Sequence, residues 1–134
     1  MHMTLEADYA VRFVDFLASC KEKTGAHTIS EQTQVPLRFT LKILRKLVDG
    51  GIIQSYKGAK GGYQLSRPPD NITLREVIEA VEGPYVINRC QKDDSPCGYA
   101  ENCRFHRAYH KISQMVRDEL ETYTFALPEE ETSR

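Results

Sequence analysis

Three cysteines and one histidine are the residues of this 134-residue chain whose types and spacing point most directly to chemistry. They follow the pattern Cys90-x6-Cys97-x5-Cys103-x2-His106. Three thiolates and an imidazole are suitable ligands for a soft or borderline metal. The residues between them are polar, and a polar segment does not gather three cysteines for core packing. The sequence therefore predicts a cysteine-rich ligand-binding loop over residues 84–104.

The width of the cysteine intervals indicates what the loop would hold. Zinc fingers and ribbons mostly use two cysteines separated by two to four residues, and this chain contains no such pair. Wider intervals favour an iron–sulfur cluster, a larger object held by three thiolates and one further ligand. A zinc ion, or bare thiols that switch by forming a disulfide, are the alternatives that the spacing leaves open.

Two residues are candidates for the fourth ligand of such a cluster. His106 follows Cys103 by three residues at the start of a predicted helix, so that both side chains can point the same way. Asp8, on the first predicted helix, is the other candidate, and in a dimer it would come from the partner subunit. The remaining cysteine, Cys20, falls on the apolar stripe of the first helix, where we expect it to pack in the core.

The elements that position these residues follow from the spacing of apolar side chains. Intervals of three and four predict helices over residues 4–21, 36–49 and 74–81, with a short helix near 28–33. Two short segments, 52–56 and 63–66, flank a glycine-rich turn and predict a β-hairpin. Three helices followed by a hairpin is the order of a winged helix-turn-helix domain. We therefore expect a mainly α fold with a small β-hairpin, the winged helix occupying residues 1–83.

The charge of the chain is strongly segregated although its net value is only −1. Residues 36–67 contain seven basic side chains and one acid, a net charge of +6, whereas the acidic residues gather toward the C-terminal tail at 128–134. The basic segment coincides with the helix and hairpin that a winged helix presents to DNA, which predicts DNA binding. The candidate contacts are Arg38, Phe39, Thr40 and Lys42 for bases, Arg45 and Lys46 for phosphates, and Lys57 and Lys60 in the wing.

A further amphipathic stripe runs through residues 105–127. A helix of about six turns that projects from a small domain needs a partner to cover its apolar side, so we expect a homodimer. No segment is apolar over the roughly 18 residues that a bilayer requires, and there is no opening leader pattern. We therefore expect a cytoplasmic protein without a membrane partner. No phosphate-cradling loop or nucleophile–base pair suggests an enzyme.

Four features together resemble one family of bacterial regulators. The opening residues 1–4, the run 8–12, the wing at 57–63 and the three spaced cysteines resemble the Rrf2 family, and the resemblance extends over residues 1–127. It implies a dimeric winged-helix regulator, usually a repressor, whose iron–sulfur cluster senses redox state, nitric oxide or iron. The cluster would control affinity for a palindromic operator in promoter DNA.

The resemblance also bears on the type of cluster. A histidine at the position of His106 resembles members with a two-iron cluster, whereas an aspartate at the position of Asp8 resembles members with a four-iron cluster. Both residues are present in this chain, so either type stays open. An iron–sulfur electron-transfer protein is the alternative from another class, but such a protein has no need of a basic helix and wing.

Overall fold

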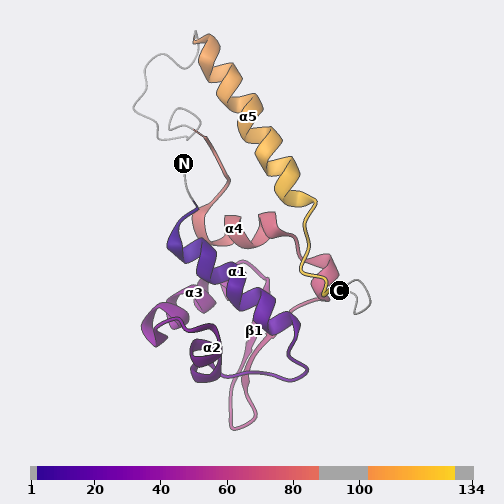
Figure 1. Cartoon of the computed structure of the whole chain (residues 1–134). Helices are drawn as coiled ribbons and strands as arrows, with labels where there is room; N and C mark the ends of the chain where they lie inside the picture. The colour runs from indigo at the N-terminus through magenta and orange to yellow at the C-terminus, as the bar shows by residue number, and fades with distance from the viewer. Residues whose placement is uncertain (1–2, 88–102, 129–134) are drawn as a thin grey trace.

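The computed structural model describes residues 3–87 and 103–128, and it confirms the predicted order of helices followed by a hairpin. The elements are α1 (Leu5–Ala18), α2 (Ala26–Thr33), α3 (Leu37–Asp49), β1 (Ile53–Tyr56), β2 (Gly62–Leu65), a 3-10 turn (Pro69–Asn71), α4 (Leu74–Glu82) and α5 (Arg104–Glu121). Figure 1 shows α5 extending away from the other elements, while α2, α3 and the hairpin lie at the opposite end. No helix within the described ranges combines the length and apolar character needed to cross a bilayer.

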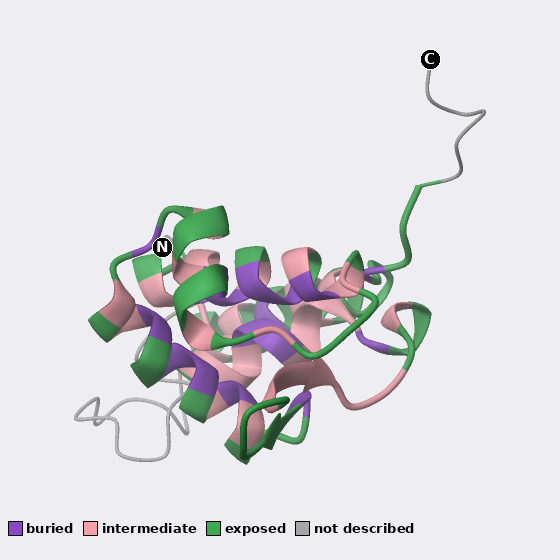
Figure 2. Cartoon of the chain, turned by 90° about the horizontal axis from the view of Figure 1, so that it is seen from below, coloured by how far each residue is buried: buried purple, intermediate pink, exposed green. Residues whose placement is uncertain are grey.

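The core lies between α1, α3 and α4. One face of α1 is fully buried at Ala7, Ala10, Phe13 and Val14, and the buried segments face inward between the helices in Figure 2. Each fully buried side chain the size of valine, leucine or phenylalanine contributes about 1.5–3 kcal/mol relative to an exposed one. The small alanines allow other elements to approach the first turns of α1 closely, so this helix is the centre of the fold.

The buried face of α3 differs at two positions, 41 and 43, from the one that the apolar spacing predicts, which consists of Leu37, Thr40, Leu41, Leu44, Leu47 and Val48. Thr40, Ile43, Leu44 and Leu47 are completely buried, whereas Leu41, which the apolar spacing assigned to the core, is 47% exposed. With 3.6 residues per turn, positions 40, 43, 44 and 47 share one side of the helix and position 41 lies outside that side. An apolar side chain therefore stands on the solvent face of α3.

The hairpin is antiparallel and is fixed to the rest of the domain by the α1–α2 loop. Ile53 is paired with Leu65 in the register of β1 and β2. The backbones of Thr24 and Tyr63 exchange two hydrogen bonds, of 3.0 and 2.8 Å. Gly62 makes this approach possible, because its φ is +139° and a Cβ atom there would lie 2.8 Å from the carbonyl of Thr24. The loop thus sets the direction in which the wing projects.

The C-terminal helix is shorter than the sequence predicted. The stripe suggested a helix to residue 127, but α5 ends at Glu121 and the chain returns to the domain. The backbone carbonyl of Tyr123 accepts from the N–H of Leu74 at 2.8 Å, and Thr124 forms a bridge with Thr73. Phe125 is only 7% exposed and joins the core. Burial of this ring outweighs the weak helix preference of the threonine-rich segment before it.

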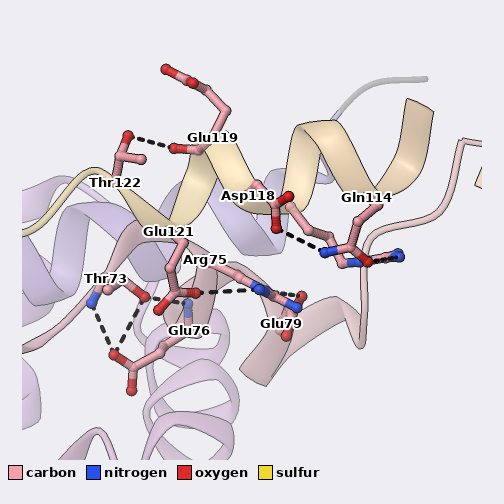
Figure 3. A network of polar contacts seen from close by, with 10 residues as sticks. Thr73, Arg75, Glu76, Glu79, Gln114, Asp118, Glu119, Glu121 and Thr122 are labelled. Carbon is pink, nitrogen blue, oxygen red and sulfur yellow. Dashed lines mark hydrogen bonds and ion pairs between the residues drawn. The ribbon is translucent and has the colours of Figure 1, made fainter. Parts of the chain in front are cut away.

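Side-chain contacts hold the C-terminal half of α5 on the domain. Arg75 of α4 donates hydrogen bonds to Glu79 on its own helix at 3.0 Å and to Glu121 of α5 at 3.4 Å, as Figure 3 shows. Near the middle of α5, the buried hydroxyl of Ser113 accepts a hydrogen bond of 2.9 Å from the backbone N–H of Ile87. The helix is therefore anchored at its C-terminal half and projects with its N-terminal half.

Candidate functional site

The exposed side of α3 is predominantly basic. Arg38, Lys42 and Arg45 are all exposed at intervals of four and three residues, which places them along one face of the helix. Leu41 is exposed among them. Arginine can bond guanine bidentately and apolar side chains can contact the methyl group of thymine. Leu41 could not be recognised as a surface residue from the sequence, because every leucine in this helix fits an apolar stripe and only the packing separates Leu41 from the others.

The side chain of Arg38 packs against the ring of the next residue, Phe39. Its guanidinium lies 4.9 Å from the centre of the Phe39 ring, within the range of a cation–π contact. Phe39 itself is half-buried and packs against the core. The ring is therefore positioned to restrict the guanidinium rather than to project into solvent.

Thr40 differs from its exposed neighbours in the proposed recognition segment. It is completely buried, and its hydroxyl lies within donating distance of the backbone carbonyls of Val35, at 3.3 Å, and Pro36, at 3.1 Å. The expectation that Thr40 helps to read bases does not agree with this placement. Its hydroxyl instead closes the turn at which α2 ends and α3 begins.

Lys42 and Lys46 are both bound by an acid of α1. The ammonium groups of Lys42 and Lys46 lie 2.8 and 2.9 Å from the two carboxylate oxygens of Glu6. The hydrogen bond from Lys42, followed by that from Lys46, holds the pKa of the Glu6 carboxyl below its usual value. The sequence does not indicate the pairing of Glu6 with these lysines, because they are 36 and 40 residues away from it along the chain. The fold alone brings the three charges together.

The wing presents further cations. Lys57 and Lys60 are exposed in the turn between β1 and β2. The turn is tight, since a Cβ atom at Gly61 would lie 2.2 Å from the carbonyl oxygen of Tyr56. The ammonium group of Lys23 lies 4.0 Å from the centre of the Tyr56 ring. This contact adds a cation beside the hairpin that is not among the predicted DNA contacts.

Two of the predicted metal ligands lie together at the start of α5. Cys103 is the N-cap residue of the helix and is half-buried. His106 lies in the first turn, where its backbone N–H donates to the carbonyl of Cys103 at 3.1 Å. Cys90 and Cys97 lie outside the residues that the structure describes. Within residues 3–87 and 103–128, no three ligating side chains come together around a common point.

Asp8 occupies a different part of the chain from these two residues. It lies on α1, and its carboxylate is 3.4 Å from the guanidinium of Arg12, which also donates to the carbonyl of Thr33 at 3.2 Å. In Figure 1, α5 begins at its projecting end, away from α1. The structure thus does not bring Asp8 and Cys103 together within one chain.

Comparison with known proteins agrees with the resemblance seen in the sequence. The profile of the Rrf2 family, described as iron-dependent transcriptional regulators, matches residues 3–127. The chain is 29% identical to protein aau3 of Rhizobium meliloti over 126 residues, which are 92% of this chain and 82% of that protein. It is 26% identical over 113 residues to an HTH-type transcriptional regulator of Aquifex aeolicus, covering 82% of this chain and 78% of the other.

Solved structures show the same fold at lower sequence identity. CymR, the global cysteine regulator of B. subtilis, is similar with a TM-score of 0.72 and 21% identity, covering 93% of each chain. IscR of T. potens is similar with a TM-score of 0.74 and 20% identity, covering 94% of this chain and 84% of the other. From the extent of the family match, the chain is a transcriptional regulator that belongs to the Rrf2 family.

Proposed function

We propose that this regulator binds a palindromic operator in promoter DNA as a homodimer, acts as a repressor, and carries an iron–sulfur cluster that controls its affinity for DNA. The observation that supports DNA binding most strongly is the concentration of exposed cations on α3 and the wing, at one end of the molecule. Arg38 would contact bases in the major groove, Arg45 would contact phosphates, and Lys57 and Lys60 would contact the backbone or minor groove.

The exposed apolar side of α5 supports the dimer. Phe105, Ile112 and Met115 on this helix are 51%, 39% and 60% exposed, although the helix is firmly attached to the domain at its other end. Large apolar side chains clustered on a projecting helix are typical of a protein interface. A two-fold dimer would present two α3 helices to half-sites separated by about one turn of DNA or a small multiple of it.

The donor set fits an iron–sulfur cluster. Cys103 and His106 are within one helical turn, and Cys90 and Cys97 would supply two further thiolates. When bound, the cluster would supply a redox-active and gas-reactive centre. Asp8 is the alternative to His106, and because α5 projects away from α1 it would come from the partner subunit. The Asp8 carboxylate would then have to leave its ion pair with Arg12 in order to bind the metal.

The position of the cysteine segment suggests how ligand binding would reach the DNA. The segment connects α4 to α5, and α4 packs against both α1 and α3. A cluster that changes the position of α4 and α5 would alter the separation of the two α3 helices in a dimer. Regulation then requires that the cluster-bound and cluster-free states differ in this separation, so that only one of them fits the operator.

The DNA contacts can be tested with duplex DNA from the region upstream of the protein's own coding sequence. We expect Arg38→Ala to lower the affinity about 5- to 100-fold and to relax sequence preference at one position. Lys57→Ala should weaken binding to all sequences and reduce the salt dependence by about one phosphate contact. Lys111→Ala, an exposed change on α5, is the matched control. Unchanged binding by both test variants would contradict the contact assignment.

The cluster can be tested by an absorption spectrum of anaerobically purified protein, with iron and sulfide counted per chain. We expect visible absorption that Cys97→Ser abolishes, and an iron count near two or four. His106→Ala and Asp8→Ala should differ, because only the true fourth ligand is required for a stable spectrum. Protein that stays colourless and binds no iron after reconstitution would exclude the cluster.

A thiol- or zinc-based switch with the same fold is the second candidate. It is favoured by the likeness to a protein named a global cysteine regulator and by the same three cysteines. In that case oxidation of metal-free protein would change operator affinity by itself, or zinc would be found bound without sulfide. An iron–sulfur electron-transfer protein is the remaining alternative, and salt-sensitive DNA binding would count against it.

A further inference from the structure

The ion pairs between α1 and α3 join one acid of α1 to two lysines of α3, the helix that is proposed to face DNA. Lys42 and Lys46 are one helical turn apart, and each contacts a different oxygen of the Glu6 carboxylate. The side chains of Lys42 and Lys46 are 56% and 37% exposed, and that of Glu6 is 30% exposed. The three residues therefore carry a net charge of +1 at neutral pH where two free lysines would carry +2.

The backbone of Glu6 is held firmly in place. Thr4 caps α1 by accepting a hydrogen bond of 3.1 Å from the N–H of Ala7. The backbone N–H and the hydroxyl of Thr4 also contact the same carboxylate oxygen of Glu82, at the end of α4, at 2.7 and 2.6 Å. Ala7 is completely buried. The first turn of α1 is therefore anchored at its backbone, which limits how far Glu6 can move with the lysines.

The other cations of the proposed DNA surface lack such a partner. Within residues 3–87 and 103–128, Arg38, Arg45, Lys57 and Lys60 form no ion pair with an acid. The compensation by Glu6 is thus confined to two lysines on one edge of α3. A DNA phosphate that approaches this edge must displace a carboxylate and also meets its negative charge.

We propose that Glu6 competes with DNA phosphates for Lys42 and Lys46 and thereby limits sequence-independent affinity. This assigns Lys42, a candidate base contact in the sequence, to phosphate contacts together with Lys46. The inference rests on the proposed DNA-binding function and names a regulator of that same surface. Non-specific binding depends almost entirely on phosphate contacts, whereas specific binding also uses base contacts. Because phosphate contacts contribute to both kinds of complex, Glu6 lowers the affinity for random DNA and for the operator by a similar factor, while the base contacts that distinguish the two are unaffected.

The test is Glu6→Gln, which keeps the shape of the side chain and removes its charge. Two probes are used, a duplex from upstream of the protein's own coding sequence and a random-sequence duplex of equal length. Exposed ion pairs are weak, so we expect about 3- to 10-fold tighter binding to the random duplex. The slope of log affinity against log salt should become steeper by up to about two phosphate contacts. A gain of similar size is expected on the upstream duplex, because the same lysines contact phosphates in both complexes.

Asp15→Asn is the matched control, because it removes one negative charge from the same helix. Asp15 is exposed and forms no ion pair within the described part of the chain. A second control is the Lys42→Gln/Lys46→Gln background, in which Glu6→Gln should have no further effect. Thermal unfolding of every variant checks that differences in binding do not arise from loss of the fold.

The possible outcomes separate this inference from the proposed function. Absence of DNA binding by the wild-type protein would overturn the proposed function and this inference with it. Wild-type binding with Glu6→Gln equal to Asp15→Asn would overturn the inference alone. Weaker binding by Glu6→Gln would also overturn it, since Glu6 would then position the lysines for phosphate. A gain that persists without Lys42 and Lys46 would assign the effect to general charge and contradict the competition.

Discussion

Arg38 and Thr40, two residues apart in the first turn of α3, lie on opposite sides of the helix. Arg38 points to solvent beside the ring of Phe39, while Thr40 is completely buried and bonded to the backbone before the helix. Their roles are set by the helical angle between them, since two residues apart means about 200° around the axis. Residue type alone suggested that both could reach DNA, and the packing assigns one to the surface and the other to the core.

Thr40→Val tests this assignment. The valine has nearly the same shape but cannot donate to the carbonyls of Val35 and Pro36. We expect a loss of about 1 kcal/mol in the free energy of unfolding, measured with urea, and an unchanged affinity for DNA below the unfolding transition. Thr28→Val, an exposed change in α2, should leave stability within about 0.5 kcal/mol. If folded Thr40→Val loses much of its affinity for DNA, Thr40 contacts DNA directly and its assignment to the core is wrong.

At the scale of elements, most of the fold was predictable because local signals agreed. The apolar spacing predicted α1, α3 and α4 to within a few residues, and the glycine-rich turn predicted the hairpin. Each of these elements has its own periodicity and its own breaker, such as Gly50 after α3. Secondary structure that is determined by neighbours in the sequence can be read from the sequence.

The remaining features depend on contacts between distant segments. The predicted apolar stripe continued past residue 121 through Tyr123 and Leu127, so the sequence did not indicate that α5 ends at Glu121 and that Phe125 enters the core. Leu41 lies on the solvent face although the spacing placed it in the core, because a stripe wider than 100° leaves the edge of a helix ambiguous. The Glu6 pairs with Lys42 and Lys46 span most of α1, α2 and α3, and no local pattern indicates them.

Phe125→Ala tests how much the returning C-terminal segment stabilises the domain. The ring is 7% exposed, and its backbone N–H donates to the carbonyl of Ile72 at 3.2 Å. We expect a loss of about 3 kcal/mol in the free energy of unfolding. Leu127→Ala removes a side chain that is 52% exposed and should cost less than about 1 kcal/mol. Equal effects of the two variants would contradict the assignment of Phe125 to the core.

At the scale of the whole molecule, one chain places its proposed surfaces at opposite ends. The cationic face of α3 and the wing lie at one end, and α5 begins at the other, with Cys103 as its N-cap. A signal at the start of α5 has to pass along a helix that is anchored to α4 by Arg75 and Glu121. In the proposed dimer this path would be shorter if α5 of one subunit contacted the domain of the other. The quaternary structure is therefore central to the proposed regulation.

Met115→Glu tests the dimer directly. Met115 is 60% exposed on α5, and a glutamate there would place one unpaired negative charge from each subunit in the proposed interface. Burying such a charge without a partner is costly, so we expect a dissociation constant of the dimer raised at least about 10-fold. Analytical ultracentrifugation over a concentration series measures it. Operator affinity should fall in parallel, because a monomer contacts only one half-site.

Gln114→Glu is the matched control for this change. It adds the same charge at the adjacent position, where Gln114 already contacts Asp118 at 2.8 Å and the guanidinium of Arg117 at 2.9 Å. This position is about 100° around the helix from Met115 and carries polar contacts, so the dimer should be retained. If Met115→Glu stays dimeric while Gln114→Glu dissociates, the interface lies on the polar side of α5. If wild-type protein is monomeric at all concentrations, DNA recognition by paired α3 helices is wrong, and Arg38 would read a single half-site.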